Sequence, residues 1–230
     1  MSVATYSHAR LDRPIIPKGS TPRKVMKAPD HDIYLRREHI AREKTNLIVK
    51  PYGGALSKTD YKVTYEAGGL LFSVSGREYN EDRKCREVRD SSGLPMFDVH
   101  RKPGFHLFSW IITLPGSKVG EGTIGKATSC GLGGGSMELW LKNGEREERL
   151  TVIKHGHVMT FFDVFQGAAF SGGRIAEFRE STLHSQKLAL RSSSRRKTRP
   201  AWDVNITPGV DMALMSALGV ILSEWYFKTD

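Results

Sequence analysis

Cysteine is scarce in this chain. Cys85 and Cys130 are its two cysteines among 230 residues, too few for the disulfide framework of a small secreted domain. Residues 1–30 also lack the apolar segment that a secretory signal peptide requires. We therefore expect free thiols in a reducing compartment, which makes this a cytoplasmic protein, peripheral to a membrane, or a nuclear one.

Long hydrophobic runs are missing too. A helix that spans a bilayer needs about 20 consecutive apolar residues. The apolar stretch Met212–Ser223 lies between the charged residues Asp211 and Glu224 and is shorter than that. The sequence therefore predicts no transmembrane segment.

Recognisable catalytic motifs are absent. The G-x-S-x-G nucleophile motif does not occur. Residues 120–127, "GEGTIGKA", nearly match a phosphate-binding loop, but Ala127 replaces the required Ser or Thr, and the glycine-rich residues that follow cannot form the required helix. We interpret them as a flexible loop between strands.

Metal-binding patterns are equally weak in the sequence. His155 and His157 could share a strand face, yet no third ligand is evident beyond His100 and His106, so we expect ordinary turn histidines. The carboxylates of "NGEREER" read as a solvated hairpin. The sequence thus predicts a protein that is not an enzyme and has no cofactor or metal.

Positive charge, in contrast, is abundant and concentrated. The net charge is +10; residues 1–45 carry ten basic and five acidic residues, and residues 191–199, "RSSSRRKTR", carry five basic and none acidic. The rest of the chain is formally neutral, so these two segments favour an anionic partner, either lipid headgroups or nucleic acid. The candidate phosphate-binding residues are Arg191, Arg195, Arg196, Lys197 and Arg199.

Short alternating segments fill the middle of the chain. In "DYKVTYEAG", Tyr61, Val63 and Tyr65 share one face, and similar segments recur between turn residues from Asn46 to Ile206. This pattern is typical of an antiparallel all-β domain. Residues 1–45 have scattered prolines and little periodicity, which predicts a basic, mostly disordered arm before a β-domain over residues 46–230.

The last segment predicts a helix over residues 208–227, with Thr207 as N-cap and Pro208 at the first helical position. Its apolar side chains point in every direction, so the helix must be buried on all sides. Since the other elements read as strands, we expect a mainly β fold, a closed antiparallel barrel wrapped around this helix. The helix residues expected in the interior are Val210, Leu214, Leu218, Ile221 and Leu222.

Two motifs resemble the LURP-one-related family of the tubby C-terminal-like superfamily. The first is the turn from Asp90 to Gly93, followed by an apolar strand that ends in Arg101 and Lys102; the second is "PGVDMAL", residues 208–214. The resemblance covers roughly residues 58–227. It implies a barrel of about twelve strands around the C-terminal helix, with residues 115–136 and 191–199 as inserted loops.

The same resemblance implies candidate functions. Tubby domains bind phosphoinositides, so we expect a non-enzymatic domain that binds anionic phospholipids through its basic loops, residues 191–199 in particular. Binding nucleic acid is the less favoured use of this charge. The alternatives are a structural or protein-interaction scaffold, nuclear and without a lipid ligand, and a scramblase-like membrane role in which the C-terminal helix inserts. The basic loop could also be an insertion with no partner.

Overall fold

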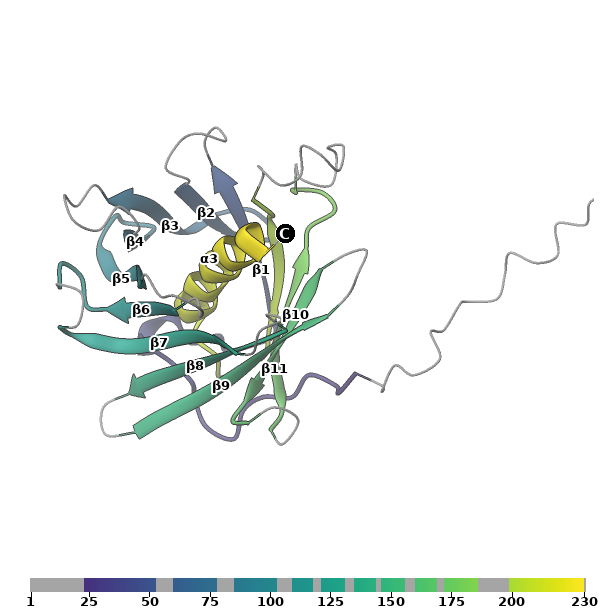
Figure 1. Ribbon diagram of the computed structural model, residues 1–230. Helices are drawn as coiled ribbons and strands as arrows, with labels where there is room; N and C mark the ends of the chain where they lie inside the picture. The colour runs from purple at the N-terminus through teal and green to yellow at the C-terminus, as the bar shows by residue number, and fades with distance from the viewer. Residues whose placement is uncertain are drawn as a thin grey trace, which may run out of the picture.

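The protein is a closed β-barrel with one helix running through its interior (Figure 1). The computed structural model describes residues 23–52, 60–77, 85–102, 109–117, 121–130, 135–143, 146–155, 160–168, 172–185 and 199–229. All neighbouring strands are antiparallel, and the barrel closes because the first strand pairs with both the second and the last. The predicted fold class is confirmed, including its twelve strands.

The elements follow one another as a simple meander. A short 3-10 helix, η1 (Arg37–His39), precedes the strands and the long helix α3 (Met212–Thr229) ends the chain. The strands are β1 (Thr45–Tyr52), β2 (Asp60–Tyr65), β3 (Leu70–Arg77), β4 (Cys85–Asp90), β5 (Pro95–Lys102), β6 (Ser109–Thr113), β7 (Thr123–Cys130), β8 (Ser136–Asn143), β9 (Arg146–His155), β10 (Phe161–Gln166), β11 (Arg174–Glu180) and β12 (Trp202–Ile206).

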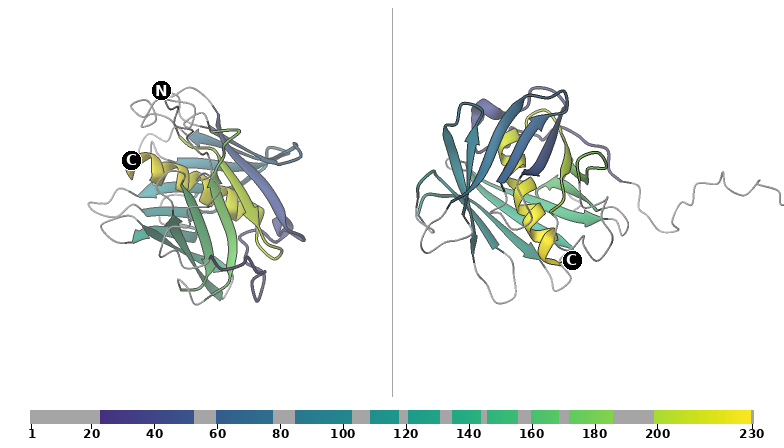
Figure 2. Two further views of the ribbon diagram at one scale, coloured as in Figure 1. Left: turned by 90° about the vertical axis from the view of Figure 1, so that its right-hand side faces the viewer. Right: turned by 90° about the horizontal axis from the view of Figure 1, so that it is seen from above.

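The core lies between the inner wall of the barrel and α3. Alternate residues of every strand point inward and join one hydrophobic cluster with the helix. All five residues predicted for the interior lie there, although the first of them precedes α3, with exposures of 1% or less: Val210, Leu214, Leu218, Ile221 and Leu222. Both further views show the barrel strands on several sides of α3 (Figure 2). Among the described residues, no helix combines the length and the hydrophobicity needed to cross a bilayer.

Close approach between α3 and the wall depends on a glycine. A Cβ atom on Gly219 would lie 3.1 Å from Val49 Cγ2 and 3.3 Å from Phe178 Cε1. Glycine lowers helix propensity by up to about 1 kcal/mol relative to alanine. Here it lets the backbone of the helix approach β1 and β11 closely.

The start of α3 differs from the prediction. Asp211, not Thr207, caps the helix: its Oδ1 accepts the N–H of Ala213 at 2.7 Å. The Thr207 hydroxyl instead donates to the carbonyl oxygen of Ile175, because residues 207–211 still bridge β12 and the helix. Thr and Asp are both good caps, so residue preference alone did not distinguish them.

Residues 23–44 pack against the barrel. Ile33 and Ala41 are buried, and both exchange backbone hydrogen bonds with residues 209–211 at the start of α3. The buried Asp211 carboxylate also accepts the N–H groups of Leu35 and Arg36. The predicted disordered arm, residues 1–45, therefore does not describe residues 23–44. Their sequence lacks periodicity because they contact the barrel through isolated bridges and not through strands. Residues 1–22 lie outside the described residues.

From Thr123 on, the segment "GEGTIGKA" belongs to strand β7 (Thr123–Cys130), so the predicted loop over residues 115–136 is wrong where it includes β7. Ala127 faces the core, Lys126 faces solvent, and the strand pairs with β6 and β8. Gly125 marks a tight packing point, since a Cβ there would lie 3.3 Å from both Ile112 Cδ1 and Leu141 Cδ2. Tertiary packing therefore overrides the weak strand preference of glycine.

Candidate functional site: a basic end of the barrel

The predicted basic loop is described only in part. Arg191, Arg195, Arg196 and Lys197 lie outside the described residues. Arg199, the last member of the set, is half-buried and comes shortly before β12. Arg199 lies at the end of the barrel where α3 terminates, because its charge acts on Tyr61 together with that of Glu224 on α3.

At this end an ion pair lies inside the barrel. Arg86, the second residue of β4, points inward, and its Nε is 3.3 Å from Glu224 Oε1 on α3. Both side chains are about 90% buried. The indole Nε1 of Trp110, in β6, donates to the other carboxylate oxygen at 3.4 Å. The carboxylate of Glu224 is thus held between a guanidinium and an indole.

Two more arginines surround this pair. Arg101, on the inward face of β5, interacts electrostatically with Glu224; burial lowers the pKa of Arg101 and the Glu224 carboxylate opposes that shift. The fields of Glu224, Arg199 and Arg86 all reach the fully buried hydroxyl of Tyr61. We name Arg86, Arg101, Arg199 and Glu224 the basic rim cluster.

Burial and the field of Glu224 raise the pKa of Tyr61 far above its usual value. The phenol therefore stays neutral. Nearby on α3, Ser223 accepts the indole N–H of Trp202 at 2.8 Å. These contacts hold the polar end of α3 in one position beneath the arginines.

The basic rim cluster can bind an anion. It holds three guanidinium groups and one carboxylate, so positive charge is in excess. Guanidinium groups match phosphate oxygens in a fork geometry and stay protonated in proteins. Arg86 is buried, whereas Arg101 and Arg199 are partly exposed, so the positive charge extends from the interior to the rim.

Of the basic rim cluster, the sequence predicts only Arg199 as a binding residue; Arg86, Arg101 and Glu224 belong to no predicted site. A signal existed for Arg86. In "CREVRD", strand alternation places Arg86 on the same face as the core residue Val88. An arginine on an inward face is uncommon unless it is paired.

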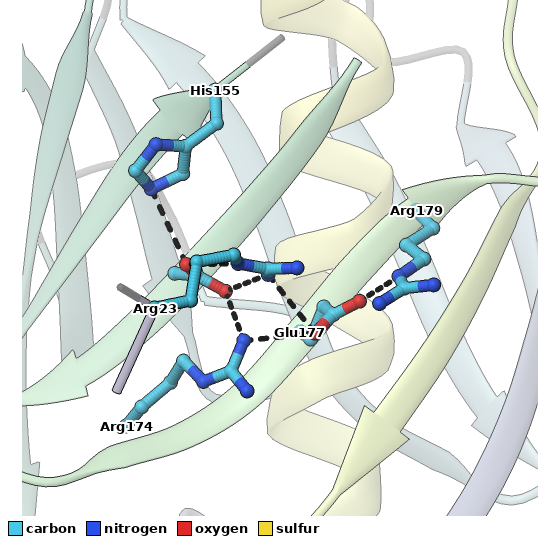
Figure 3. Close-up of polar contacts among 6 residues, drawn as sticks. Arg23, His155, Arg174, Glu177 and Arg179 are labelled. Carbon is cyan, nitrogen blue, oxygen red and sulfur yellow. Dashed lines mark hydrogen bonds and ion pairs between the residues drawn. The ribbon is translucent and has the colours of Figure 1, made fainter. Parts of the chain in front are cut away.

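A second charged cluster lies on the outer wall and ties the N-terminal segment to the barrel (Figure 3). Asp163 and Glu177 are opposite each other on β10 and β11 and are both buried. Arg174 Nη1 is 2.9 Å from a carboxylate oxygen of each, and Arg23 also pairs with both. Arg179 contacts Glu177 as well. Its carboxylates are already paired with arginines, one of which, Arg23, belongs to the N-terminal segment. We call this cluster the clamp, because it joins that segment to β10 and β11.

His155, which the sequence predicts together with His157 to be a turn histidine, borders the same clamp. Its Nε2 is 3.3 Å from Asp163 Oδ2, and its ring stacks on Phe161. Burial lowers the pKa of His155 although the Asp163 charge opposes the shift, so the ring is neutral at pH 7. It ends β9 rather than lying in a turn. His157 and His106 lie outside the described residues.

Comparisons with known proteins agree with this architecture. The family described as LURP-one-related (LOR) matches residues 45–223. An X-ray structure of a protein from Arabidopsis thaliana superposes with a TM-score of 0.54 at 16% identity, over 84% of this chain and 98% of that chain. An identity this low supports the fold alone. No curated protein matches the chain.

Proposed function

Since this chain belongs to the LURP-one-related family, we propose that it is a non-enzymatic domain that binds anionic phospholipids, phosphoinositides in particular, at the arginine-rich end of its barrel. The basic rim cluster would receive the headgroup phosphate, and the cations of residues 191–197 would add attraction to the negatively charged surface.

The observation that carries this proposal is the excess of guanidinium groups over carboxylates in the basic rim cluster. Each cation near an anionic membrane contributes about 1 kcal/mol. Arg199 belongs both to the cluster and to the basic segment. Because Arg199 is common to both, we propose that the two sources of charge act on one surface.

Co-sedimentation with vesicles of neutral lipid plus a few per cent phosphoinositide tests the proposal. We expect the full chain to bind, and the variant Arg195→Ala, Arg196→Ala, Lys197→Ala and Arg199→Ala to bind at least about tenfold more weakly, since even half of the nominal 4 kcal/mol exceeds 1.4 kcal/mol.

A charge-matched control separates a site from general attraction. Its four substitutions, to alanine, remove exposed cations from the outer wall: Lys50, Lys62, Lys126 and Lys142. The control variant should retain most of the binding. Equal losses of binding in both variants would mean that the interaction depends only on net charge. Unchanged binding in the variant with four substitutions in residues 195–199 would mean that these residues are not part of the site.

One observation favours the scaffold alternative. At the opposite end of the barrel, Leu70, Leu94 and Leu114 are 44%, 64% and 46% exposed. They lie at the turns after β2, β4 and β6, which are neighbouring hairpins of the barrel. Grouped apolar side chains on a rim suit a protein partner. A scaffold would show no vesicle binding and would lose crosslinked partners when these leucines become serine.

A scramblase-like role requires more rearrangement. α3 is enclosed by the barrel and contributes much of its core. Insertion of this helix into a membrane would expose the inner wall to water. We therefore favour a peripheral interaction of the intact barrel, and a near-ultraviolet circular dichroism spectrum that is unchanged by vesicles would support it.

A further inference from the structure

Three residues of different metal-binding types meet on the outer face of the β4–β5 hairpin. They are Cys85, Asp98 and His100, with exposures of 0%, 1% and 4%. One ligand atom of each, the thiol sulfur, a carboxylate oxygen and an imidazole nitrogen, lies within 4.8 Å of the other two.

Strand pairing brings these residues together. Cys85 is directly opposite His100 in the β4–β5 register, and Asp98 precedes His100 by two residues on the same face. Alternation therefore places all three on the outer side of the barrel, behind the inward-facing Arg86 and Arg101 of the basic rim cluster. The trio is a product of the fold and not of a local sequence motif.

The separation of the sulfur and the nitrogen is close to that in a tetrahedral zinc site. With metal–ligand bonds near 2.3 Å for sulfur and 2.0–2.1 Å for nitrogen, tetrahedral geometry puts these two atoms about 3.6 Å apart. Cys85 Sγ and His100 Nε2 are 4.0 Å apart, so a small rotation of either side chain closes the difference.

Neighbouring groups already orient the ligands. The backbone N–H of Gly116 donates to Asp98 Oδ2 at 2.9 Å. The hydroxyl of Thr113, a fully buried residue, lies 3.1 Å from His100 Nε2, the same nitrogen that faces the thiol. The Gly116 bond fixes the carboxylate as an outer-shell partner does in metal sites, whereas the Thr113 hydroxyl must turn its hydrogen away from Nε2 when that nitrogen binds a metal.

We propose that Cys85, Asp98 and His100 bind one zinc ion on the outer wall of the barrel. A thiolate with an imidazole and a carboxylate is a zinc donor set. Ca²⁺ and Mg²⁺ prefer six or more oxygen ligands, which this trio does not offer. The two negative ligands balance the charge of Zn²⁺, so the buried site would be neutral overall.

Metal binding can be measured without any lipid. Reduced protein, stripped with a chelator and passed through a desalting column, is titrated with Co²⁺ as a spectroscopic substitute and then with Zn²⁺. We expect one equivalent of Co²⁺ to produce a thiolate-to-cobalt charge-transfer band and tetrahedral ligand-field bands, which one equivalent of Zn²⁺ then removes.

Variants assign the ligands. Cys85→Ala should abolish the charge-transfer band, and His100→Gln or Asp98→Asn should weaken Zn²⁺ binding by more than the about 10–100-fold typical of losing an outer-shell partner. The matched control is Cys130→Ala, which removes the other cysteine and should change nothing. X-ray absorption on the zinc-loaded wild type should show one sulfur among the ligands.

Some results would overturn the site. They are the absence of a charge-transfer band in the wild type, a band that survives Cys85→Ala, or a band lost in Cys130→Ala. The wild-type titration and X-ray absorption need no variant, so they decide the question even if a substituted barrel fails to fold. Normal zinc binding together with absent vesicle binding would leave this site standing and refute only the proposed function.

Discussion

The substitution Glu224→Gln should affect stability and anion binding in opposite directions. It keeps the shape of the side chain but removes the carboxylate from the basic rim cluster. The buried guanidinium of Arg86 then loses its ion pair. The same change leaves three positive groups without the negative charge that now competes with an incoming phosphate.

The expected loss of stability follows from the geometry. Unit charges 3.3 Å apart attract by about 5 kcal/mol at an effective dielectric constant of 20. Lower desolvation of the neutral amide returns part of this energy, whereas the uncompensated buried guanidinium adds a cost; removing one partner of a buried pair typically costs about 3–5 kcal/mol. We expect about 3 kcal/mol, which lowers Tm by about 6–12 °C for a domain of this size.

Urea denaturation followed by the fluorescence of the buried tryptophans measures this loss. The control Glu147→Gln removes an exposed carboxylate from β9 and should cost less than about 0.5 kcal/mol. A soluble inositol polyphosphate should raise the Tm of Glu224→Gln more than that of the wild type. A loss below about 1 kcal/mol, or an equal response of both proteins to the polyphosphate, would refute the arrangement of charges described above.

Three further predictions test the barrel and the clamp. Leu218→Ala should lower the free energy of unfolding by about 2–5 kcal/mol in urea denaturation, because it opens a cavity between α3 and the wall; a loss under 1 kcal/mol would mean that the helix is not enclosed. Gly125→Val should cost about 1–3 kcal/mol by overpacking against Ile112 and Leu141, and a neutral result would contradict the tight contact in β7. Burial lowers the pKa of His155 below the ordinary 6.5. Between the folded-state pKa and 6.5 the unfolded state binds more protons, so the free energy of unfolding falls as pH falls. Denaturation curves from pH 7 to pH 5 should show that this free energy falls less steeply in His155→Gln than in the wild type, and parallel falls would exclude this contribution.

Much of the fold was accessible from sequence because it depends on local periodicity and burial. The helix near the C-terminus has apolar side chains in every direction, which requires enclosure, and the surrounding strands alternate clearly. The predicted turn at Asp90 forms as expected: its Oδ1 accepts the N–H groups of Ser92 and Leu94, and Gly93 has a φ of 89°.

The strand that the pattern missed is β7. At the inward positions of its sequence, "TIGKATSC", a strand normally has large apolar residues, but β7 has Gly125 and Ala127. These small residues fit there because they pack against bulky neighbours. A single sequence does not reveal the size of the side chains across the barrel. The family resemblance supplied the strand count that residue patterns could not.

The candidate sites were less accessible, for a related reason. Arg86 and Glu224 are separated by most of the chain, and Cys85 reaches His100 only through the β4–β5 register. Neither pair forms a local motif. The sequence could indicate a basic segment and an inward-facing arginine, whereas the partners of each depend on how the barrel closes.

The order of the elements has a consequence for synthesis of the protein. Thr45 pairs with Ile206, and α3 follows that last strand. During synthesis the first eleven strands therefore leave the ribosome before β12, which closes the barrel, and before α3, which fills its interior. Until then the nascent chain has unpaired strand edges and an exposed apolar inner wall. We therefore expect C-terminally truncated chains to depend on chaperones and to aggregate rather than to form a smaller stable domain.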